Sequence, residues 1–209
     1  MQLETIDLRP TKIVGIGVNY RAHAVEMGKG LPSEPLMFLK PPSALLAPGD
    51  AIRRPGGYAR VDYEGELGVV IAKRTSGISR ERALECVLGY CCVNDVTVRE
   101  LQAKDGQWAR AKGFDTFCPI GPRVVPGLDP RDLRITTRVN GVVKQDSRTS
   151  DLIFDVPALI AFVSAHMTLE PHDIISTGTP AGVGNLAVGD VCEIEIEGIG
   201  ILRNGVVER

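Results

Sequence analysis

The sequence predicts an α+β fold of short, mixed-direction strands with about three helices. The 209 residues include 23 glycines and 14 prolines, a composition that favours many turns over long helices. Two Asn-Gly pairs between β-rich flanks are typical of hairpins. A regular alternation of strand and helix patterns is missing from the sequence, so a doubly wound parallel sheet is disfavoured.

The N-terminal elements follow from local patterns. A β-rich run at 11–18 predicts a strand, and the helix formers at 19–27 predict a short helix that ends at Gly28 and Gly30. Six prolines lie between residues 31 and 55. They exclude a helix there, so extended segments and turns are expected.

Three elements are expected in the next part of the chain. Alternation of polar and apolar residues predicts a strand at 61–72. Residues 79–87 have a helical pattern with Ser79 as the expected N-cap. The nearly unbroken apolar run at 88–93 predicts a strand buried on both faces, and it ends at Asn94-Asp95.

The C-terminal half contains both Asn-Gly pairs. Hairpins with type I′ turns are expected at 133–145, around Asn140-Gly141, and at 199–207, around Asn204-Gly205. Between them, Pro157 suits the first turn of a helix over 158–167.

Length and charge limit the functions available to the chain. With 209 residues it is expected to form one domain, 1–209, whose residues 1–10 are a short extension. A net charge of −2 without a basic stripe argues against a nucleic-acid partner. The longest apolar stretch, 152–169, is too polar to cross a bilayer. A small molecule is therefore the expected partner.

The cysteines and the N-terminus predict a cytoplasmic protein. The cysteines are odd in number, form no Cys-x-x-Cys motif and lie mostly in apolar runs, which favours reduced core thiols. They are Cys86, Cys91, Cys92, Cys118 and Cys192. Residues 1–10 have neither the basic and apolar regions of a signal peptide nor the character of a transit peptide.

Two glycine motifs resemble nucleotide-binding loops only in part. Gly15-Ile16-Gly17 follows a strand, but Tyr20 stands where a dinucleotide fingerprint has its third glycine. The segment 178–184 is rich in glycine, yet it has no Gly-Lys-Ser/Thr ending. Its backbone N–H groups could bind a carboxylate, or it could be a tight connection between strands.

Acidic residues alternate along the strand expected at 61–72. Period-2 geometry puts Asp62, Glu64 and Glu66 on one face, where burial demands a cation. A solvated face is the alternative, and 193–197 has an equally acidic alternation that suits a surface strand. The first acidic pair flanks Gly65, which permits close backbone approach and favours a site there.

A third carboxylate completes a candidate metal site. Asp95 follows the buried strand at 88–93, where an acid is seldom buried without a partner. Glu64, Glu66 and Asp95 would offer only carboxylate oxygens, which suit Mg²⁺ or Mn²⁺. Zinc is disfavoured because no Cys/His cluster has the spacing of its sites.

Three further residues could take part in chemistry. His23 and Glu26 are neighbours on the expected helix, so they could form a general acid/base pair or an incidental surface ion pair. Lys112, next to Gly113 and Phe114, is either a desolvated cation beside an anion or a solvent-facing lysine. His166 and His172 lack a partner pattern and are expected to be structural or exposed.

Several motifs together resemble one enzyme family. They are Asn19–Met27, Glu34–Pro41, Tyr63–Leu67, Asn94-Asp95, Ala111–Phe114 and Thr177–Gly184. In this order, they resemble the fumarylacetoacetate hydrolase family. The sequence is most similar to its compact members, which act on acylpyruvates, oxaloacetate or 2-hydroxyhepta-2,4-diene-1,7-dioate.

The resemblance implies a fold and a set of roles. It implies a mixed β-sandwich roll with a few short helices, usually a homodimer, and Mg²⁺ or Mn²⁺ held by the three carboxylates. It makes residues 19–30 a mobile lid that carries the catalytic His23 and Glu26. It also implies substrate contacts at five residues, which are Lys40, Arg99, Gln102, Lys112 and Thr179, with Lys112 catalytic as well.

The implied metal site could support three reactions. A 2-oxo acid could chelate the metal, which would stabilise an enolate when a bond to C3 breaks. Hydrolysis of an acylpyruvate or fumarylpyruvate and decarboxylation of oxaloacetate both yield this enolate. Proton transfer alone would give a dienedioate isomerase of aromatic catabolism. A non-catalytic metal-binding domain is a remote alternative, because it would need neither His23 and Glu26 nor Lys112.

Overall fold

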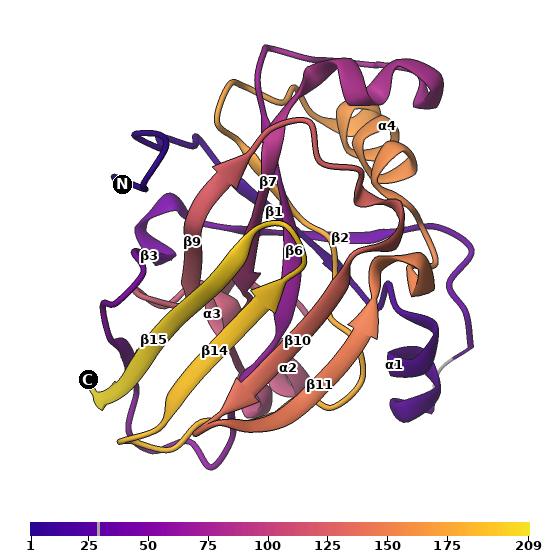
Figure 1. The fold of residues 1–209 in the computed structure, drawn as a ribbon. Coiled ribbons are helices and arrows are strands. Elements are labelled where there is room, and N and C mark those ends of the chain that lie inside the picture. The colour runs from indigo at the N-terminus through magenta and orange to yellow at the C-terminus, as the bar shows by residue number, and fades with distance from the viewer. Residues whose placement is uncertain (29) are drawn as a thin grey trace.

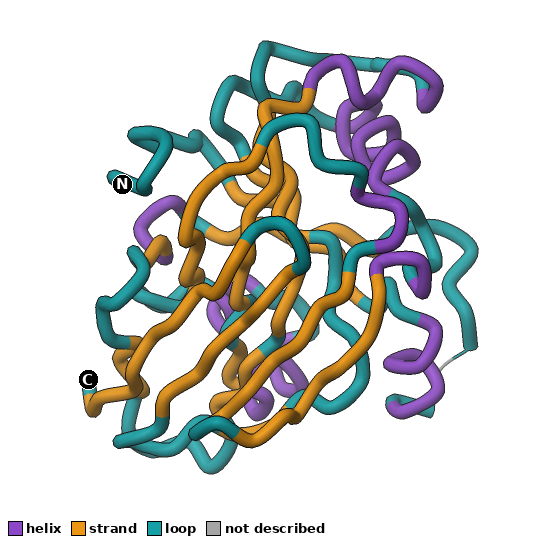
Figure 2. The backbone as a smooth tube through the Cα atoms, viewed as in Figure 1, coloured by secondary structure: helices purple, strands orange, loops and turns teal. Residues whose placement is uncertain are grey.

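A computed structural model of the chain describes residues 1–28 and 30–209. It confirms the predicted α+β fold, a roll of curled sheets that contain both parallel and antiparallel pairs. The strands form the centre of the molecule, α1 (Arg21–Glu26) and α4 (Val156–His166) lie at its periphery, and α2 (Arg99–Asp105) and α3 (Ala109–Lys112) lie behind the front strands in this view (Figures 1 and 2). Residue 29, part of the predicted lid 19–30, lies outside the described residues.

The largest sheet has seven strands and carries most of the candidate site. Its order is β2 (Leu36–Lys40), β1 (Ile13–Gly17), β12 (Ile174–Ser176), β6 (Gly65–Ile71), β7 (Val87–Asn94), β9 (Cys118–Val125) and β3 (Leu45–Leu46). β1 pairs in parallel with β12, whereas β6 and β7 pair antiparallel, with Glu66 opposite Val93. The register brings the end of β7 next to the start of β6.

A five-stranded sheet lies across the first (Figure 1). It consists of β11 (Val142–Arg148), β10 (Arg134–Val139), β14 (Val191–Ile196), β15 (Gly200–Glu208) and β4 (Ile52–Arg54). A small third sheet contains β13 (Gly184–Asn185), β5 (Val61–Tyr63) and β8 (Thr97–Val98). The main core is packed between the two large sheets, where Leu67 and Val69 meet Ile135, Ile194 and Leu202.

Four α-helices are described, two of them unpredicted. They are α1 (Arg21–Glu26), α2 (Arg99–Asp105), α3 (Ala109–Lys112) and α4 (Val156–His166), and the short 3₁₀ helices are η1 (Pro42–Ala44), η2 (Arg80–Cys86), η3 (Pro130–Asp132) and η4 (Thr149–Asp151). α4 has Pro157 in its first turn, as expected, and the structure adds Asp155 as its N-cap. None of the described helices has the length and apolar character that a membrane crossing needs.

Two predicted elements differ in detail. The helix expected at 79–87 is the 3₁₀ helix η2, and the Ser79 side chain makes no capping bond. The strand expected at 61–72 is interrupted at Glu64, which divides it between two sheets as β5 and β6. The interruption arises because the Glu64 N–H donates to the Asn94 side chain, at 3.0 Å, instead of continuing a ladder.

The five cysteines are free and buried, as predicted. The N-terminal ten residues pack onto the fold through Leu3 and Leu8, which are buried in a second apolar cluster with Ile120. The expectation of a single domain over 1–209 stays a prediction.

The two Asn-Gly pairs have different structures. Asn140 and Gly141 join β10 to β11 with φ angles of 52° and 77°, as a type I′ turn requires. The hairpin predicted around Asn204-Gly205 is wrong, because β15 runs straight through both residues and pairs with β14 and β4. Asn204 is buried, and its Nδ2 donates to the carbonyl oxygens of Ala47 and Asp50, at 2.8 and 2.9 Å.

This difference is testable with matched glycine variants. Gly141→Ala places a side chain in the left-handed region and should cost about 1–2 kcal/mol in the free energy of unfolding. Gly205→Ala should change it by less than about 0.5 kcal/mol, because an added Cβ meets no atom within 4 Å. Urea denaturation measures both. Equal destabilisation would contradict the continuous strand β15.

Candidate active site

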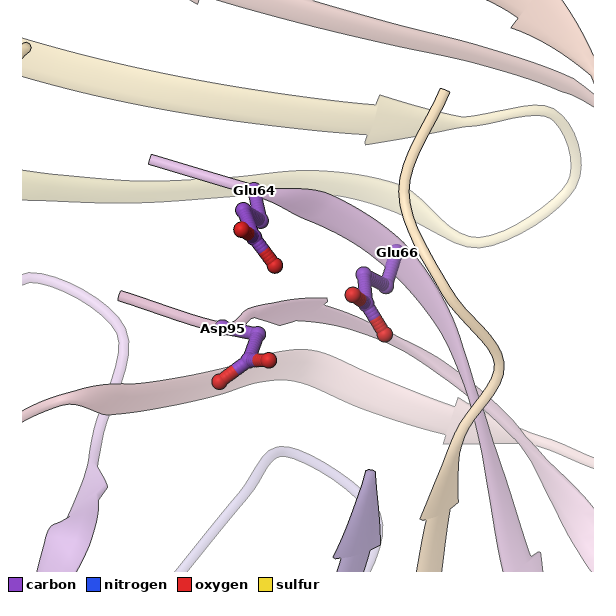
Figure 3. A group of neighbouring side chains, drawn as sticks. All are labelled: Glu64, Glu66 and Asp95. Carbon is purple, nitrogen blue, oxygen red and sulfur yellow. The ribbon is translucent and has the colours of Figure 1, made fainter. Parts of the chain in front are cut away.

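Three buried carboxylates converge where β6 and β7 meet. Glu64 lies at the break before β6, Glu66 is the second residue of β6, and Asp95 follows β7. One oxygen from each lies within 4.8 Å of the others, and Figure 3 shows the three side chains facing a common space. The sequence-predicted cluster is therefore assembled in the structure.

Gly65 makes this arrangement possible. An added Cβ would lie 2.2 Å from Thr137 Oγ1, so another residue fits between the two glutamates only if the Thr137 side chain moves. The Gly65 N–H donates to Gln145 Oε1 at 3.0 Å, and the Asp95 N–H donates to the Glu64 carbonyl at 2.9 Å. These bonds hold the backbone at Glu64, Gly65 and Asp95 in place.

Lys112, the last residue of α3, lies between two of these carboxylates. Its Nζ donates to Asp95 Oδ2 at 2.5 Å and to Glu64 Oε2 at 3.1 Å, and Thr97 Oγ1 is 2.7 Å away. Burial by itself lowers the pKa of Lys112, but Asp95 and Glu64 outweigh it and raise that pKa above its ordinary value. Lys112 is therefore a buried cation whose charge the two carboxylates stabilise.

Lys40 is a second buried lysine at Asp95. It is the last residue of β2, and its Nζ contacts Asp95 Oδ1 and donates to the Phe117 carbonyl at 2.7 Å. Lys40 is not among the described residues that line the adjacent cavity. It neutralises and orients Asp95 in this structure, and its contact with substrate stays a prediction.

Arg99 and Gln102 belong to α2. Arg99 Nε donates to Asp62 Oδ2 at 2.8 Å, and its Nη1 donates to Gln102 Oε1 at 2.9 Å. Its Nη2 lies 2.5 Å from Glu64 Oε1, an ion-pair contact that lacks hydrogen-bond geometry. Arg60 also donates to Asp62 Oδ2, at 2.7 Å. Asp62 is therefore held between two guanidinium groups.

The two glutamates have opposite electrostatic environments. Burial acts to raise the pKa of Glu64, but Lys112 and Arg99 outweigh it and lower this pKa to about 2. Burial raises the pKa of Glu66 to about 8, and the negative charges of Asp95 and Glu64 act in the same direction. Glu66 is thus the carboxylate whose charge is least compensated.

The partners of Glu66 explain this difference. Ser176 Oγ donates to Glu66 Oε2 at 2.5 Å, and the Gly178 N–H donates to the same oxygen at 2.8 Å. Among the ion pairs of residues 1–28 and 30–209, none involves Glu66. A cation bound among the three carboxylates would supply the missing charge. Oxygen-only ligands of this kind fit a hard divalent ion.

His23 and Glu26 form the predicted dyad on α1. His23 is buried, and its Nδ1 lies 2.8 Å from Glu26 Oε2. Glu26 Oε1 accepts a bond from the Gly182 N–H at 3.1 Å. The glycine-rich segment 178–184 therefore binds carboxylates of the protein itself, through Gly178 and Gly182.

A cavity of about 540 Å³ connects these groups. It is lined by His23, Glu26, Glu64, Glu66, Arg99, Gln102, Lys112 and Thr179, together with an apolar wall. Thr179 Oγ1 donates to the Gly65 carbonyl at 3.0 Å and accepts from Gln145 Nε2 at 2.8 Å. Asp95 is not among the described lining residues and is held behind them by Lys40 and Lys112.

Several residues of the site were not found by sequence reasoning. Ser176, Thr97 and Gln145 bind Glu66, Lys112 and Gly65, and no local pattern marks them. Arg60 could have been found from the sequence, because it lies two residues before Asp62 and next to the strand that begins at Val61. His166 and His172 are outside the site, as expected: His166 Nδ1 contacts the Phe162 carbonyl, and His172 Nδ1 accepts from the Arg9 N–H.

The mixed β-roll brings a carboxylate cluster, a buried lysine and a His–Glu dyad together around one cavity, an arrangement that suits an enzyme active site. Comparison with known proteins specifies the class. Residues 12–207 match the family model described as fumarylacetoacetate (FAA) hydrolase, C-terminal. The chain belongs to the fumarylacetoacetate hydrolase family, as the sequence motifs predicted.

Individual relatives cover nearly all of the chain. An uncharacterised protein of Methanocaldococcus jannaschii is 56% identical, over 96% of this chain and 84% of the relative. The 2,4-didehydro-3-deoxy-L-rhamnonate hydrolase of a Sphingomonas species is 44% identical, over 94% and 73%. The crystal structure of 2-hydroxyhepta-2,4-diene-1,7-dioate isomerase from Mycobacterium marinum superposes with a TM-score of 0.91 and 47% identity, over 97% and 76%.

The raised pKa of Glu66 predicts a pH dependence of stability. Between pH 4.5 and about 8 the unfolded chain loses the Glu66 proton while the folded protein keeps it, so metal-free stability should fall across this window. Glu66→Gln should lose less stability across the same window, because the amide cannot ionise. Urea denaturation in a chelator from pH 5 to 8.5 measures the difference. Parallel curves for the two proteins would contradict the assigned environment of Glu66.

Proposed function

We propose that the protein is a divalent-metal-dependent enzyme that acts on 2-oxo acids or their enols. It cleaves a C–C bond, by hydrolysis of an acylpyruvate-type or fumarylpyruvate-type substrate or by decarboxylation of an oxaloacetate-type one. One observation carries the proposal: Glu64 and Glu66, Lys112 and the His23–Glu26 dyad all line a single cavity. Membership of a family with hydrolases and isomerases supports enzymatic activity.

Glu64, Glu66 and Asp95 would hold the ion, as Mg²⁺ or Mn²⁺. When bound, such an ion supplies a Lewis acid that favours negative charge on the oxygens of a 2-oxo acid. Lys112 adds a fixed positive charge at the same end of the cavity, where it faces the substrate carboxylate or the enolate. Arg99, Gln102 and Thr179 offer further polar contacts to this end.

The dyad supplies proton transfer. Because His23 Nδ1 is bonded to Glu26, the ring can present Nε2 as the acceptor for a proton. In hydrolysis, His23 takes a proton from a water molecule that attacks the distal carbonyl carbon. Glu26 stabilises the resulting imidazolium, and the Gly182 N–H holds Glu26 in place.

An isomerase of 2-hydroxyhepta-2,4-diene-1,7-dioate in aromatic catabolism is the alternative. The structure of such an isomerase, from Mycobacterium marinum, is 47% identical to this chain and supports this alternative. In that reaction the dyad would move a proton between oxygen and carbon of the substrate, and no C–C bond would break. The same lining residues serve both reactions.

We also infer a homodimer in the cytoplasm. β2 is an edge strand of the seven-stranded sheet, and its Leu36 and Leu39 are exposed, which suits burial by a second copy. Five free, buried thiols suit a reducing compartment. Sedimentation equilibrium tests the dimer, and a monomer at micromolar concentration would contradict it.

A substrate panel tests the proposed reaction. The protein should turn over at least one of acetylpyruvate, fumarylpyruvate or oxaloacetate with Mg²⁺ or Mn²⁺, and a chelator should abolish turnover. Pyruvate release measures cleavage, and loss of diene absorbance without pyruvate measures isomerisation. Turnover of the hydroxy-dienedioate alone would favour the isomerase. Flat progress curves across a wide panel of 2-oxo acids would favour a non-catalytic metal-binding domain.

Two variants separate metal binding from proton transfer. Glu66→Ala should lose both metal binding and turnover, because one ligand is removed. His23→Ala should keep metal binding and lower kcat by about 10²–10⁴-fold, the range of general acid–base catalysis. Calorimetric titration with Mn²⁺ and turnover assays measure both effects.

Glu193→Ala is the matched control for Glu66→Ala. Glu193 belongs to the acidic alternation of β14, on the outer side of its sheet, and should change neither property. Equal loss of metal from His23→Ala and Glu66→Ala would contradict this division of roles.

A further inference from the structure

The two glycines of the Gly15-Ile16-Gly17 motif have a structural role that is unrelated to nucleotide binding. Gly15 on β1 pairs with Phe38 on β2, and a Cβ at Gly15 would lie 2.2 Å from the Phe38 ring. A Cβ at Gly17 would lie 2.6 Å from the indole ring of Trp108. Because Gly15 and Gly17 have no side chains, the rings of Phe38 and Trp108 can pack directly on the backbone of β1.

These two rings form one wall of the cavity. Their centroids are 5.2 Å apart with an interplanar angle of 61°, an edge-to-face pair, and both side chains are half-buried. Both line the cavity, together with Ile16, Met27 and Val183. This wall is apolar, and Glu64, Glu66 and Lys112 line the same cavity.

The aromatic wall begins at the reactive end. Lys112 Nζ is 4.9 Å from the centroid of the Phe38 ring and 5.8 Å from that of Trp108, both within cation–π distance. A 2-oxo acid whose carboxylate lies near Lys112 would therefore place its next atoms against these rings. A cavity of about 540 Å³ also falls in the range of about 300–1,000 Å³ that is typical of small-molecule sites.

We propose that Phe38 and Trp108 determine substrate specificity by binding a flat, unsaturated segment attached to the 2-oxo acid end. This inference rests on the proposed function and narrows its substrate class. A short, polar substrate such as oxaloacetate leaves the wall uncovered. A substrate with a conjugated or aromatic extension buries its flat face on the rings, and this contact raises its affinity.

Calorimetric titration of the Mn²⁺-loaded protein with two stable ligands tests the proposal. Pyruvate presents the 2-oxo acid alone, and phenylpyruvate adds a flat apolar group. Trp108→Ala should lower the affinity for phenylpyruvate about tenfold or more and the affinity for pyruvate less than about twofold. The reason is that only the longer ligand loses stacking area. Trp108→Phe should restore most of the difference, since it keeps an aromatic face.

A second pair of variants tests the role of the glycines. Gly17→Ala should displace the Trp108 indole and lower the affinity for phenylpyruvate more than the affinity for pyruvate. Gly56→Ala is the matched control, because its Cβ meets no atom within 4 Å, and both affinities should stay unchanged. Thermal unfolding of each variant verifies that the fold is retained.

The outcomes separate this inference from the proposed function. If Trp108→Ala weakens both ligands equally while the variant stays folded, the wall has only a structural role and the inference is overturned. The same holds if the wild-type protein binds pyruvate as tightly as phenylpyruvate. If the wild-type protein binds Mn²⁺ but neither ligand, the proposed 2-oxo acid site itself fails, and the inference fails with it.

Discussion

The structure depends on the burial of carboxylates among fixed cations. Burying an ionised carboxylate without a partner is too costly for a fold of ordinary stability. The protein meets this constraint with Lys40 and Lys112 on Asp95, and with Lys112 and Arg99 on Glu64. Each cation comes from a different element, β2, α2 or α3, so the carboxylates tie these elements to the sheet. The site and the fold are stabilised by the same contacts.

This dependence explains which features could be predicted from sequence. A turn such as Asn140-Gly141 is specified by backbone conformation, which is local, so its pattern sufficed. Asn204-Gly205 has the same two residue types, but the Asn204 side chain hydrogen-bonds to two carbonyl groups more than 150 residues away in the chain. No pattern in the neighbouring residues indicates these bonds. Likewise, the break at Glu64 depends on the side chain of Asn94, so alternation alone predicted one continuous strand.

In the candidate site, too, features set by neighbouring residues were predicted and features set by distant residues were not. Period-2 alternation and the end of a buried strand predicted the three carboxylates, because both signals lie in neighbouring residues. The helices α2 and α3, which present Arg99 and Lys112, are too short for a periodic pattern and were not predicted. Gln145 and Ser176 reach Gly65 and Glu66 from distant strands, and only tertiary structure reveals them. Lys40, Arg99 and Lys112 were themselves named from the sequence, as substrate contacts. The ion pairs of Lys40 and Arg99 with the carboxylates were not predicted, and they come only with the tertiary structure.

Charge balance connects the cluster to the kind of substrate it suits. When Glu66 is ionised, as it would be beside a bound cation, Asp62, Glu64, Glu66 and Asp95 are matched in number by Lys40, Arg60, Arg99 and Lys112, although Glu66 touches none of these cations. With a divalent ion bound, the positive charges would exceed the negative ones by two. The enolate of a 2-oxo acid carries two negative charges, one on its carboxylate and one on its oxygen. A neutral or cationic ligand would leave the excess positive charge uncompensated at this end of the cavity, so the cluster favours a ligand whose negative charge moves onto the enolate oxygen as it reacts.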